Sequence, residues 1–171
     1  MKHIYTLLFL ISLFKALSQP FEVSSIHELR FVEGVDTVHA RTISYWNMND
    51  AQLKDSLTEG LLFDYKFKVY NSLGKALHNP KGVVNCLLKF EFKQAKYRCT
   101  FYEMVFTPMV RNRYGRFEED RGKSRPLDPD QFKGTKTYEK LTRQVKFRID
   151  QLLTEFDQFL DRKPALKQED W

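Results

Sequence analysis

The sequence lacks the short motifs that mark common catalytic and ligand-binding sites. It contains no Cys-x-x-Cys, His-Glu-x-x-His or Gly-x-Ser-x-Gly pattern, no glycine loop that would bind phosphate and no EF-hand loop. Beyond the N-terminal segment, His27, His39 and His78 lie in separate stretches, so only the tertiary structure could gather them around a metal. We therefore expect no cofactor and no metal, and the sequence leaves open whether the protein is an enzyme.

Cysteine is nearly absent, with only Cys86 and Cys99 in the chain. In an oxidising compartment such a pair suggests a disulfide. The strand pairing predicted below places the two residues about 13 Å apart along a hairpin. That separation is well beyond the roughly 7 Å between Cα atoms that a disulfide can bridge. We therefore predict two buried free thiols.

Long apolar runs are also absent after the first residues of the chain. Residues 4–14 form a mostly apolar run behind the basic start Met1-Lys2-His3, and they are too few to cross a bilayer. Small residues at Ala16 and Ser18 match a signal-peptidase site, so the pattern predicts a signal peptide over residues 1–18. The protein would then be exported to the periplasm or cell envelope, and a retained membrane anchor is the alternative. No later run of about 18 apolar residues occurs, so we expect no transmembrane segment after cleavage.

The whole chain carries a net charge of +6. A basic balance can indicate nucleic-acid binding, but an exported protein meets little nucleic acid, so we expect none as a partner. An envelope protein or an anionic glycan is a more natural partner for such a surface. The sequence does not indicate an oligomeric state.

What the sequence does contain is a strong β-hairpin pattern over residues 83–106. Two stretches rich in aromatic and β-branched residues alternate between apolar and polar side chains and meet at Gln94-Ala95. A two-residue turn there places Phe90 opposite Cys99 on the apolar face. A slip by one residue would exchange the two faces, so the register is well specified.

Two elements are predicted before the hairpin. Residues 37–46 alternate loosely and indicate a strand, while Asn49 and Asp50 are good helix N-caps. We therefore predict a helix from there to about Asp64, although Gly60 weakens it. Its buried stripe would consist of leucines spaced by four, Leu53, Leu57 and Leu61.

Shorter segments complete this half of the chain. Residues 19–28 are predicted to be a flexible lead-in, and residues 29–32 and 75–77 are candidates for short strands. Residues 65–70 alternate again and predict a strand with Phe67 and Val69 inward.

The last element is the clearest helix. From Tyr138, apolar residues recur every three or four positions, and charged residues and glutamine fill the other side. This pattern predicts one amphipathic helix of about 25 residues, roughly 37 Å long. The helix would end before Lys163-Pro164.

These elements predict a two-layer α+β fold, with a curved antiparallel sheet and two helices packed on its apolar face. The domain would span residues 37–161, after the signal peptide and a lead-in over residues 19–36. Within it, residues 107–136 are predicted to form a long charged loop, because Thr107-Pro108 should end the second hairpin strand. Residues 162–171 would be a C-terminal tail.

The hairpin also resembles a known family. The stretch Phe92-Lys93-Gln94-Ala95-Lys96-Tyr97-Arg98 is similar to the Phe-Lys-Asp-Gly-Lys/Arg-Tyr-Arg hairpin of exported Bacteroidota proteins with a domain of unknown function. That family has a TATA-binding-protein-like (TBP-like) fold, and its helix, loop and closing helix fall in similar places over residues 37–160. Gln94-Ala95 departs from the family's usual Asp-Gly. The resemblance implies the curved sheet with helices on one face, and it implies no catalytic residue.

Two candidate binding surfaces follow from the predicted hairpin. The face opposite the helices would carry Leu87 directly across from Tyr102, with Met104 nearby, and this apolar spot could seat a protein or peptide. Alternatively, the N-terminal segment or the arginine-rich loop covers it. That loop is the second candidate surface, because interleaved arginine and aromatic residues can bind phosphate or acidic glycans. Its arginines are Arg111, Arg113 and Arg116. Alternatively, the loop is solvated and these arginines form ion pairs with the nearby Glu118, Glu119 and Asp120.

We therefore expect an exported, non-catalytic binding or interaction module. One alternative is a hydrolase that uses acid–base chemistry, for which Glu103 and His39 are the only candidates. Glu103 falls on the apolar side of its strand, opposite Cys86, where a buried carboxyl group could act as an acid. Alternatively, the strand twists and Glu103 reaches solvent near the margin of the sheet. The other alternative is a binder of anionic polymers that uses the arginine-rich loop.

Overall fold

The computed structural model describes residues 20–29, 34–57, 60–70, 80–93, 95–132 and 135–162, with the backbone alone at positions 35, 57 and 135. The predicted signal peptide, the predicted strand over residues 75–77, most of that over residues 29–32 and nearly all of the C-terminal tail lie outside these residues. The strands are β1 (Val23–Glu28), β2 (Gln52–Leu57), β3 (Gly60–Tyr70), β4 (Pro80–Lys93), β5 (Lys96–Arg111), β6 (Phe117–Glu119) and β7 (Arg125–Pro126). The helices are α2 (Val35–Met48), α3 (Thr135–Leu160) and the short 3-10 turns η1 (Arg121–Lys123) and η2 (Pro129–Gln131).

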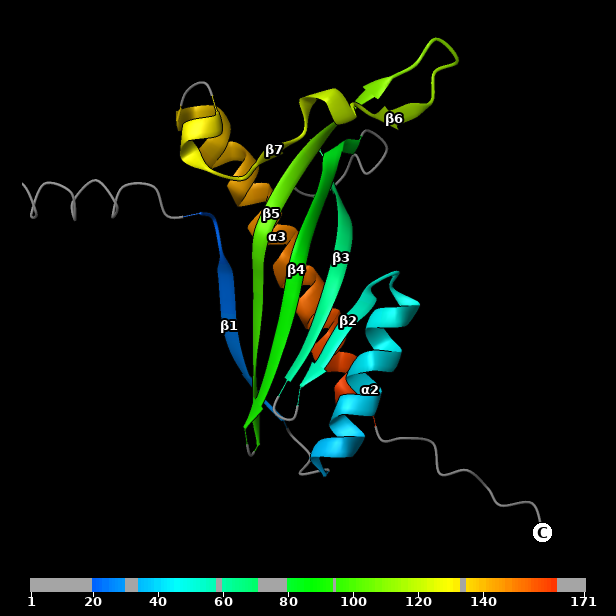
Figure 1. Ribbon diagram of the computed structural model, residues 1–171, viewed down its shortest axis with the longest axis vertical. Helices are drawn as coiled ribbons and strands as arrows, with labels where there is room; N and C mark the ends of the chain where they lie inside the picture. The colour runs from blue at the N-terminus through cyan, green and yellow to red at the C-terminus, as the bar shows by residue number, and fades with distance from the viewer. Residues whose placement is uncertain are drawn as a thin grey trace, which may run out of the picture.

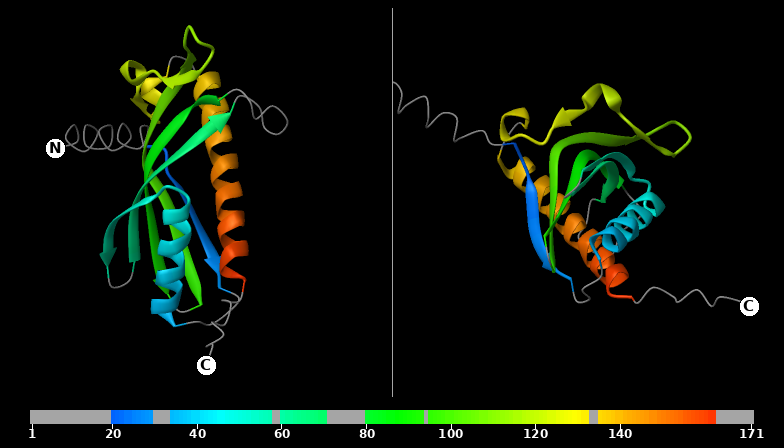
Figure 2. Two further views of the ribbon diagram at one scale, coloured as in Figure 1. Left: turned by 90° about the vertical axis from the view of Figure 1, so that its right-hand side faces the viewer. Right: turned by 60° about the horizontal axis from the view of Figure 1, so that its bottom comes forward.

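The strands form one antiparallel sheet in the order β1-β5-β4-β3-β2, and β6 and β7 also pair with β5. The long α3 crosses behind the strands in Figure 1, and α2 lies beside β2. Seen from its lower end, the sheet curves around both helices (Figure 2). The predicted α+β fold, with a curved antiparallel sheet and two helices, is confirmed.

The predicted hairpin is also confirmed, with the predicted register from the turn as far as Leu87; beyond it the pairing shifts by one residue. Phe90 pairs with Cys99 and Leu87 with Tyr102, as the alternation of side chains required. Cys86 and Cys99 are both buried free thiols, as predicted. Apolar residues on one side of these strands are buried. A slip by one residue would expose them to solvent, so their burial stabilises the observed register.

The prediction of a strand over residues 37–46 is wrong, because this segment belongs to α2. Its alternation was carried by small residues, and the structure leaves Ala40 and Ser44 exposed. The residues that are buried, Val38, Thr42, Tyr45 and Trp46, follow helical spacing instead.

The helix predicted from residue 50 to about residue 64 is wrong as well. Asn49 ends α2, donating from its side-chain amide to the Tyr45 carbonyl oxygen at 2.9 Å. Asp50 then adopts the left-handed conformation that often follows a helix, with φ at 62°. β2 and β3 follow as an antiparallel pair. In β3 the buried residues alternate with exposed ones, so period two outweighs the leucine spacing of four; the buried residues are Leu61, Phe63, Tyr65, Phe67 and Val69.

α3 confirms the predicted closing helix and, with α2, covers one face of the sheet. Trp46 of α2 is fully buried where the layers meet. The centre of its ring lies 5.7 Å from that of Phe90 on β4 and 5.7 Å from that of Phe156 on α3. Because one side chain contacts the sheet and both helices, we call this side the inner face and the opposite side the outer face.

Two segments predicted to be irregular are ordered strands. Within the predicted lead-in, β1 pairs with the first half of β5, from Val23 opposite Phe101 to Glu28 opposite Lys96. Its alternation of half-buried and exposed residues is too weak to see without the neighbouring strand. The predicted charged loop over residues 107–136 is wrong, because β5 continues through Pro108 and then pairs with β6, while β7 pairs with its middle.

Candidate functional site

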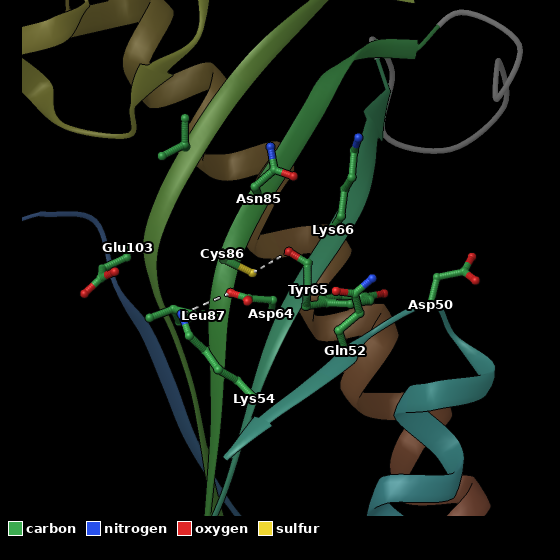
Figure 3. Close-up of a pocket in the computed structure, with 11 residues that line it drawn as sticks. Asp50, Gln52, Lys54, Asp64, Tyr65, Lys66, Asn85, Cys86, Leu87 and Glu103 are labelled. Atoms are coloured by element: carbon green, nitrogen blue, oxygen red, sulfur yellow. Dashed lines mark hydrogen bonds and ion pairs between the residues drawn. The ribbon is translucent and has the colours of Figure 1, made fainter. Parts of the chain in front are cut away.

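The outer face carries a cavity of about 440 Å³, bordered by β2, β3, β4 and β5 (Figure 3). Its base is made by alternate residues of adjacent strands, because side chains on one face recur every second position. We call it the outer groove. Its lining residues include Asp50, Gln52, Lys54, Asp64, Lys66, Leu87 and Glu103.

The centre of the outer groove is an ion pair above an apolar residue. Asp64 of β3 lies directly opposite Leu87 of β4 in the ladder. Lys54 of β2 reaches Asp64 with its Nζ 3.7 Å from Oδ1, and Figure 3 shows this contact beside Leu87. Both charged side chains are about half exposed, so the pair contributes less than about 1 kcal/mol to stability and can open for a ligand.

The β5 rim of the groove is shaped by a β-bulge. Asn85 pairs with Val105 and Leu87 with Tyr102, so Glu103 and Met104 together oppose the single residue Cys86. The extra residue turns Met104 into the core and leaves Glu103 exposed. The prediction that Met104 lies on the outer face is therefore wrong. Of the two alternatives for Glu103, the exposed one is confirmed, and the bulge rather than strand twist accounts for it.

Glu103 occupies a strained backbone position. Its φ is 50°, in the left-handed region where glycine is favoured and where other residues cost about 1 kcal/mol or more. A bulge of this kind usually places glycine there. A strained residue beside a cavity is a common mark of a functional position.

β6 contacts the outer groove through one of its lining residues, Lys66. Lys66 on β3 donates from Nζ to Oε1 of Glu119 on β6 at 2.5 Å. This contact ties the β5–β6 hairpin to the middle of the sheet. β6, which follows the arginine-rich segment, therefore reaches the outer face, but Leu87 and Tyr102 remain partly exposed.

The buried residues that line the groove, Cys86 and Tyr65, are uncharged, and its charged side chains are exposed to solvent. Burial, with a smaller contribution from Asp64, raises the pKa of the Cys86 thiol to about 12, so this thiol is protonated near neutral pH. Burial also raises the pKa of the Tyr65 phenol well above its ordinary value. Among the described lining residues, three carboxylates (Asp50, Asp64 and Glu103) outnumber the two lysines. The groove is therefore locally acidic on a basic protein.

The arginine-rich segment forms the tip of the β5–β6 hairpin. Arg111 donates from Nε to the Gly115 carbonyl oxygen at 2.9 Å, and Arg113 lies over the Tyr114 ring at 4.8 Å. With Arg116, they are exposed, and within the described residues none forms an ion pair with an acidic side chain. The neighbouring acids contact other groups: Glu118 accepts from Asn112, Glu119 from Lys66 and Asp120 from Lys123.

The structure does not bring Glu103 and His39 together. His39 of α2 packs against Phe92, which pairs with Tyr97 at the other end of the hairpin. Tyr97 and Glu103 are about six positions apart along β5, which corresponds to roughly 20 Å along the strand. The Nε2 atom of His39 is buried and has no hydrogen-bond partner among the described residues. An acid–base pair of these two residues is therefore excluded by distance.

Sequence reasoning missed the β2 and β3 side of the groove, because Lys54 and Asp64 were assigned to a helix. Only the alternation of Asp64, Lys66 and Lys68 with apolar residues could have indicated it. Throughout the described part of the chain, no three His, Cys, Asp or Glu side chains are grouped in a way that could hold a metal ion. No described helix is both long and apolar enough to span a bilayer.

This arrangement, an open antiparallel sheet with two helices, defines the class of fold: it is TBP-like. A solved TBP-like protein from Parabacteroides distasonis is similar to the chain with a TM-score of 0.59 and 8% identity, covering 85% of this chain and 95% of that one. A DUF4468 family protein from Bacteroides ovatus is similar with a TM-score of 0.55 and 12% identity, covering 85% and 89%. No family model and no curated protein sequence matches the chain. At these identities the likeness shows the fold alone.

Proposed function

We infer that the protein is an exported binding module that holds an extended, basic segment of a partner protein or peptide in the outer groove. The observation that carries this inference is the strained Glu103 at the rim of a cavity on an open sheet face. An extended segment suits the groove because its side chains alternate with the same period as those of the strands beneath. Support for export is the predicted signal peptide of residues 1–18.

The acidic and apolar side chains of the outer groove indicate the chemistry of the expected ligand. Lysine or arginine side chains of the partner would face Asp50, Asp64 and Glu103, and apolar side chains would cover Leu87 and Tyr102. The apolar contact supplies affinity and the charges supply orientation. No covalent chemistry is required in this groove.

Two synthetic hexapeptides test the inference, Lys-Val-Lys-Leu-Lys-Val and its counterpart with glutamate in place of lysine. Each would be titrated into isotopically labelled protein from residue 19 onward while backbone amide chemical shifts are recorded. We expect the basic peptide to shift the amides of residues 64, 87 and 103, and the acidic peptide to shift none of them. Shifts confined to other surfaces, or equal shifts with both peptides, would contradict the inference.

A matched pair of substitutions sharpens this test. Asp64→Asn should lower the affinity for the basic peptide about fivefold, because one partly exposed charge pair contributes up to about 1 kcal/mol. Asp36→Asn removes an exposed carboxylate at the start of α2 and should leave the affinity unchanged. Equal effects of the two substitutions would indicate a long-range charge effect rather than binding in the groove.

A second candidate function is favoured by the hairpin tip, where Arg111, Arg113 and Arg116 are exposed and the nearby acids contact other groups. These arginines would bind an anionic glycan. Binding to alginate, measured at 50 mM and 300 mM salt, should fall steeply with salt and should be lost when all three are changed to alanine. Binding that does not depend on salt would exclude this function.

A further inference from the structure

A second cluster of polar side chains lies on the inner face, at the flank between β1 and α3. Ser25 and His27 project from β1, Tyr97 from β5 and Asp157 from α3. His27 Nε2 lies 2.9 Å from Ser25 Oγ, and His27 Nδ1 lies 2.8 Å from Asp157 Oδ2. Tyr97 donates from its hydroxyl group to Asp157 Oδ1 at 2.5 Å. The four side chains form one continuous hydrogen-bonded chain.

The direction of each hydrogen bond in this chain follows from chemistry. Burial, together with the hydrogen bond to Asp157, raises the pKa of Tyr97 far above its ordinary value, so Tyr97 keeps its proton and donates it. The ionised Asp157 carboxylate can only accept, so His27 must donate to it from Nδ1. In neutral His27 the other nitrogen, Nε2, then carries a lone pair and accepts the hydroxyl proton of Ser25.

The ring of His27 is held in this orientation. It stacks on the Tyr97 ring with centres 5.0 Å apart and planes 10° from parallel. Tyr97 itself is 1% exposed, so it provides a rigid support. The side chains of His27 and Asp157 are 23% and 34% exposed, which leaves the site accessible from solvent at the flank of the domain.

The backbone offers one donor for a developing negative charge. The Leu29 N–H donates to the Ala95 carbonyl oxygen at 2.7 Å. This hydrogen bond determines which backbone amides of β1 point toward β5. Because amides in an antiparallel ladder point alternately toward and away from the partner, those of Ser25 and His27 face β5 and that of Ile26 faces away. β1 is the outermost strand of the described sheet, so the Ile26 N–H lies at its edge, directly after Ser25. The amide that follows a nucleophilic serine serves as an oxyanion donor in other folds.

We propose that Ser25 is a nucleophile that accepts small acyl groups from carboxylic esters, with His27 as general base and Asp157 as the residue that orients it. Ser25 Oγ attacks the ester carbonyl carbon, its proton moves to His27 Nε2, and the Ile26 N–H receives the carbonyl oxygen as it becomes negative. Collapse breaks the bond to the leaving alcohol, which takes the proton from His27. Water, deprotonated by His27, then attacks the acyl–Ser25 ester; the bond to Ser25 Oγ breaks, His27 returns the proton to Ser25 Oγ, and the acid is released.

Esters are the expected class because the site offers one backbone donor, and a weakly stabilised oxyanion suffices only when the leaving group is good. The site uses residues that the outer groove does not, so it stands or fails independently of peptide binding. It would replace the expectation of a non-catalytic module with that of a weak esterase.

The decisive experiment is covalent labelling of the wild-type protein with a fluorophosphonate, followed by peptide mapping. In this reaction Ser25 Oγ forms a bond to phosphorus, fluoride leaves, and the proton goes to His27. We expect the label on Ser25 in folded protein and none after urea unfolding. Absence of label from Ser25 in folded wild-type protein would overturn the proposal whatever the variants do.

Variants separate this chemistry from a structural role. Ser25→Ala should abolish both labelling and hydrolysis of 4-nitrophenyl acetate, whereas Ser24→Ala should not. Ser24 is the matched control, since it is the adjacent serine on the outer face, with its hydroxyl oxygen 3.1 Å from that of Thr100. His27→Gln should slow acylation by roughly 10² to 10⁴-fold, the usual contribution of a general base. Hydrolysis by Ser25→Ala at the wild-type rate would also overturn the proposal, and circular dichroism would verify that each variant is folded.

Discussion

The two faces of the same strands differ in almost every physical respect. Leu88 and Leu87 are adjacent in β4, yet Leu88 is 0% exposed under the helices while Leu87 lies half-buried in the outer groove. The inner face packs aromatic rings around Trp46, and the outer face carries charged residues above a few apolar ones. Along one hairpin, the residues that face inward stabilise the fold and the alternate residues that face outward are available for binding. A substitution on one face should therefore have a limited effect on the property that depends on the other face.

The largest effect is expected at the centre of the inner face. Trp46→Ala should lower the free energy of unfolding by about 3–5 kcal/mol, because it removes a fully buried side chain that contacts the sheet and both helices. Urea unfolding followed by circular dichroism would measure it. Trp46→Phe should be milder, since it keeps an aromatic ring and removes an indole N–H that has no acceptor among the described residues. A loss below 1 kcal/mol for the alanine variant would contradict the central role of Trp46.

The adjacent leucines provide the most direct comparison of the two faces. Leu88→Ala should cost about 2–5 kcal/mol, whereas Leu87→Ala should cost less than about 1 kcal/mol and weaken the basic peptide instead. The measurements are urea unfolding and the peptide titration described above. Similar losses of stability in both variants would mean that the outer face is covered.

Gly82 tests how closely β4 and β5 approach on the inner face. A Cβ atom there would lie 2.3 Å from the Phe106 ring and 2.6 Å from the Thr107 carbonyl oxygen. Gly82→Ala should therefore lower the melting temperature through a loss of about 1–3 kcal/mol. Gly122→Ala is the control, because its nearest neighbour would be 3.6 Å away on an exposed turn. A neutral Gly82→Ala variant would show that the strands separate more easily than the packing implies.

The smallest effect is expected at the strained bulge. Glu103→Gly should raise stability by up to about 1 kcal/mol, because glycine adopts positive φ without strain. Glu103→Gln retains the strain and removes the charge, so it should leave stability unchanged and weaken the basic peptide. If both variants have wild-type stability, the bulge imposes no measurable strain.

Local pattern was sufficient to predict part of this architecture. The register between β4 and β5 follows from strict alternation, and α3 follows from a sustained helical stripe of apolar residues. In both cases many residues repeat one period, so an occasional exception does not change the prediction. The apolar pair of Leu87 and Tyr102 was predicted for the same reason.

Short or mixed patterns were insufficient elsewhere. Residues 37–64 contain small residues and regularly spaced leucines that favoured the wrong elements, and burial around Trp46 decided between helix and strand. The bulge at Glu103 could not be predicted, because one inserted residue leaves no periodic signal.

The sequence by itself determined one long hairpin with two unlike faces and one closing helix, because the alternation of the strands and the helical spacing of apolar residues each repeat over many residues. Only the tertiary structure decided how the remaining strands extend the sheet and which distant side chains meet. The outer groove joins four strands, and the cluster of Ser25, His27 and Asp157 joins residues about 130 positions apart. Such contacts depend on packing between elements, which no local pattern encodes.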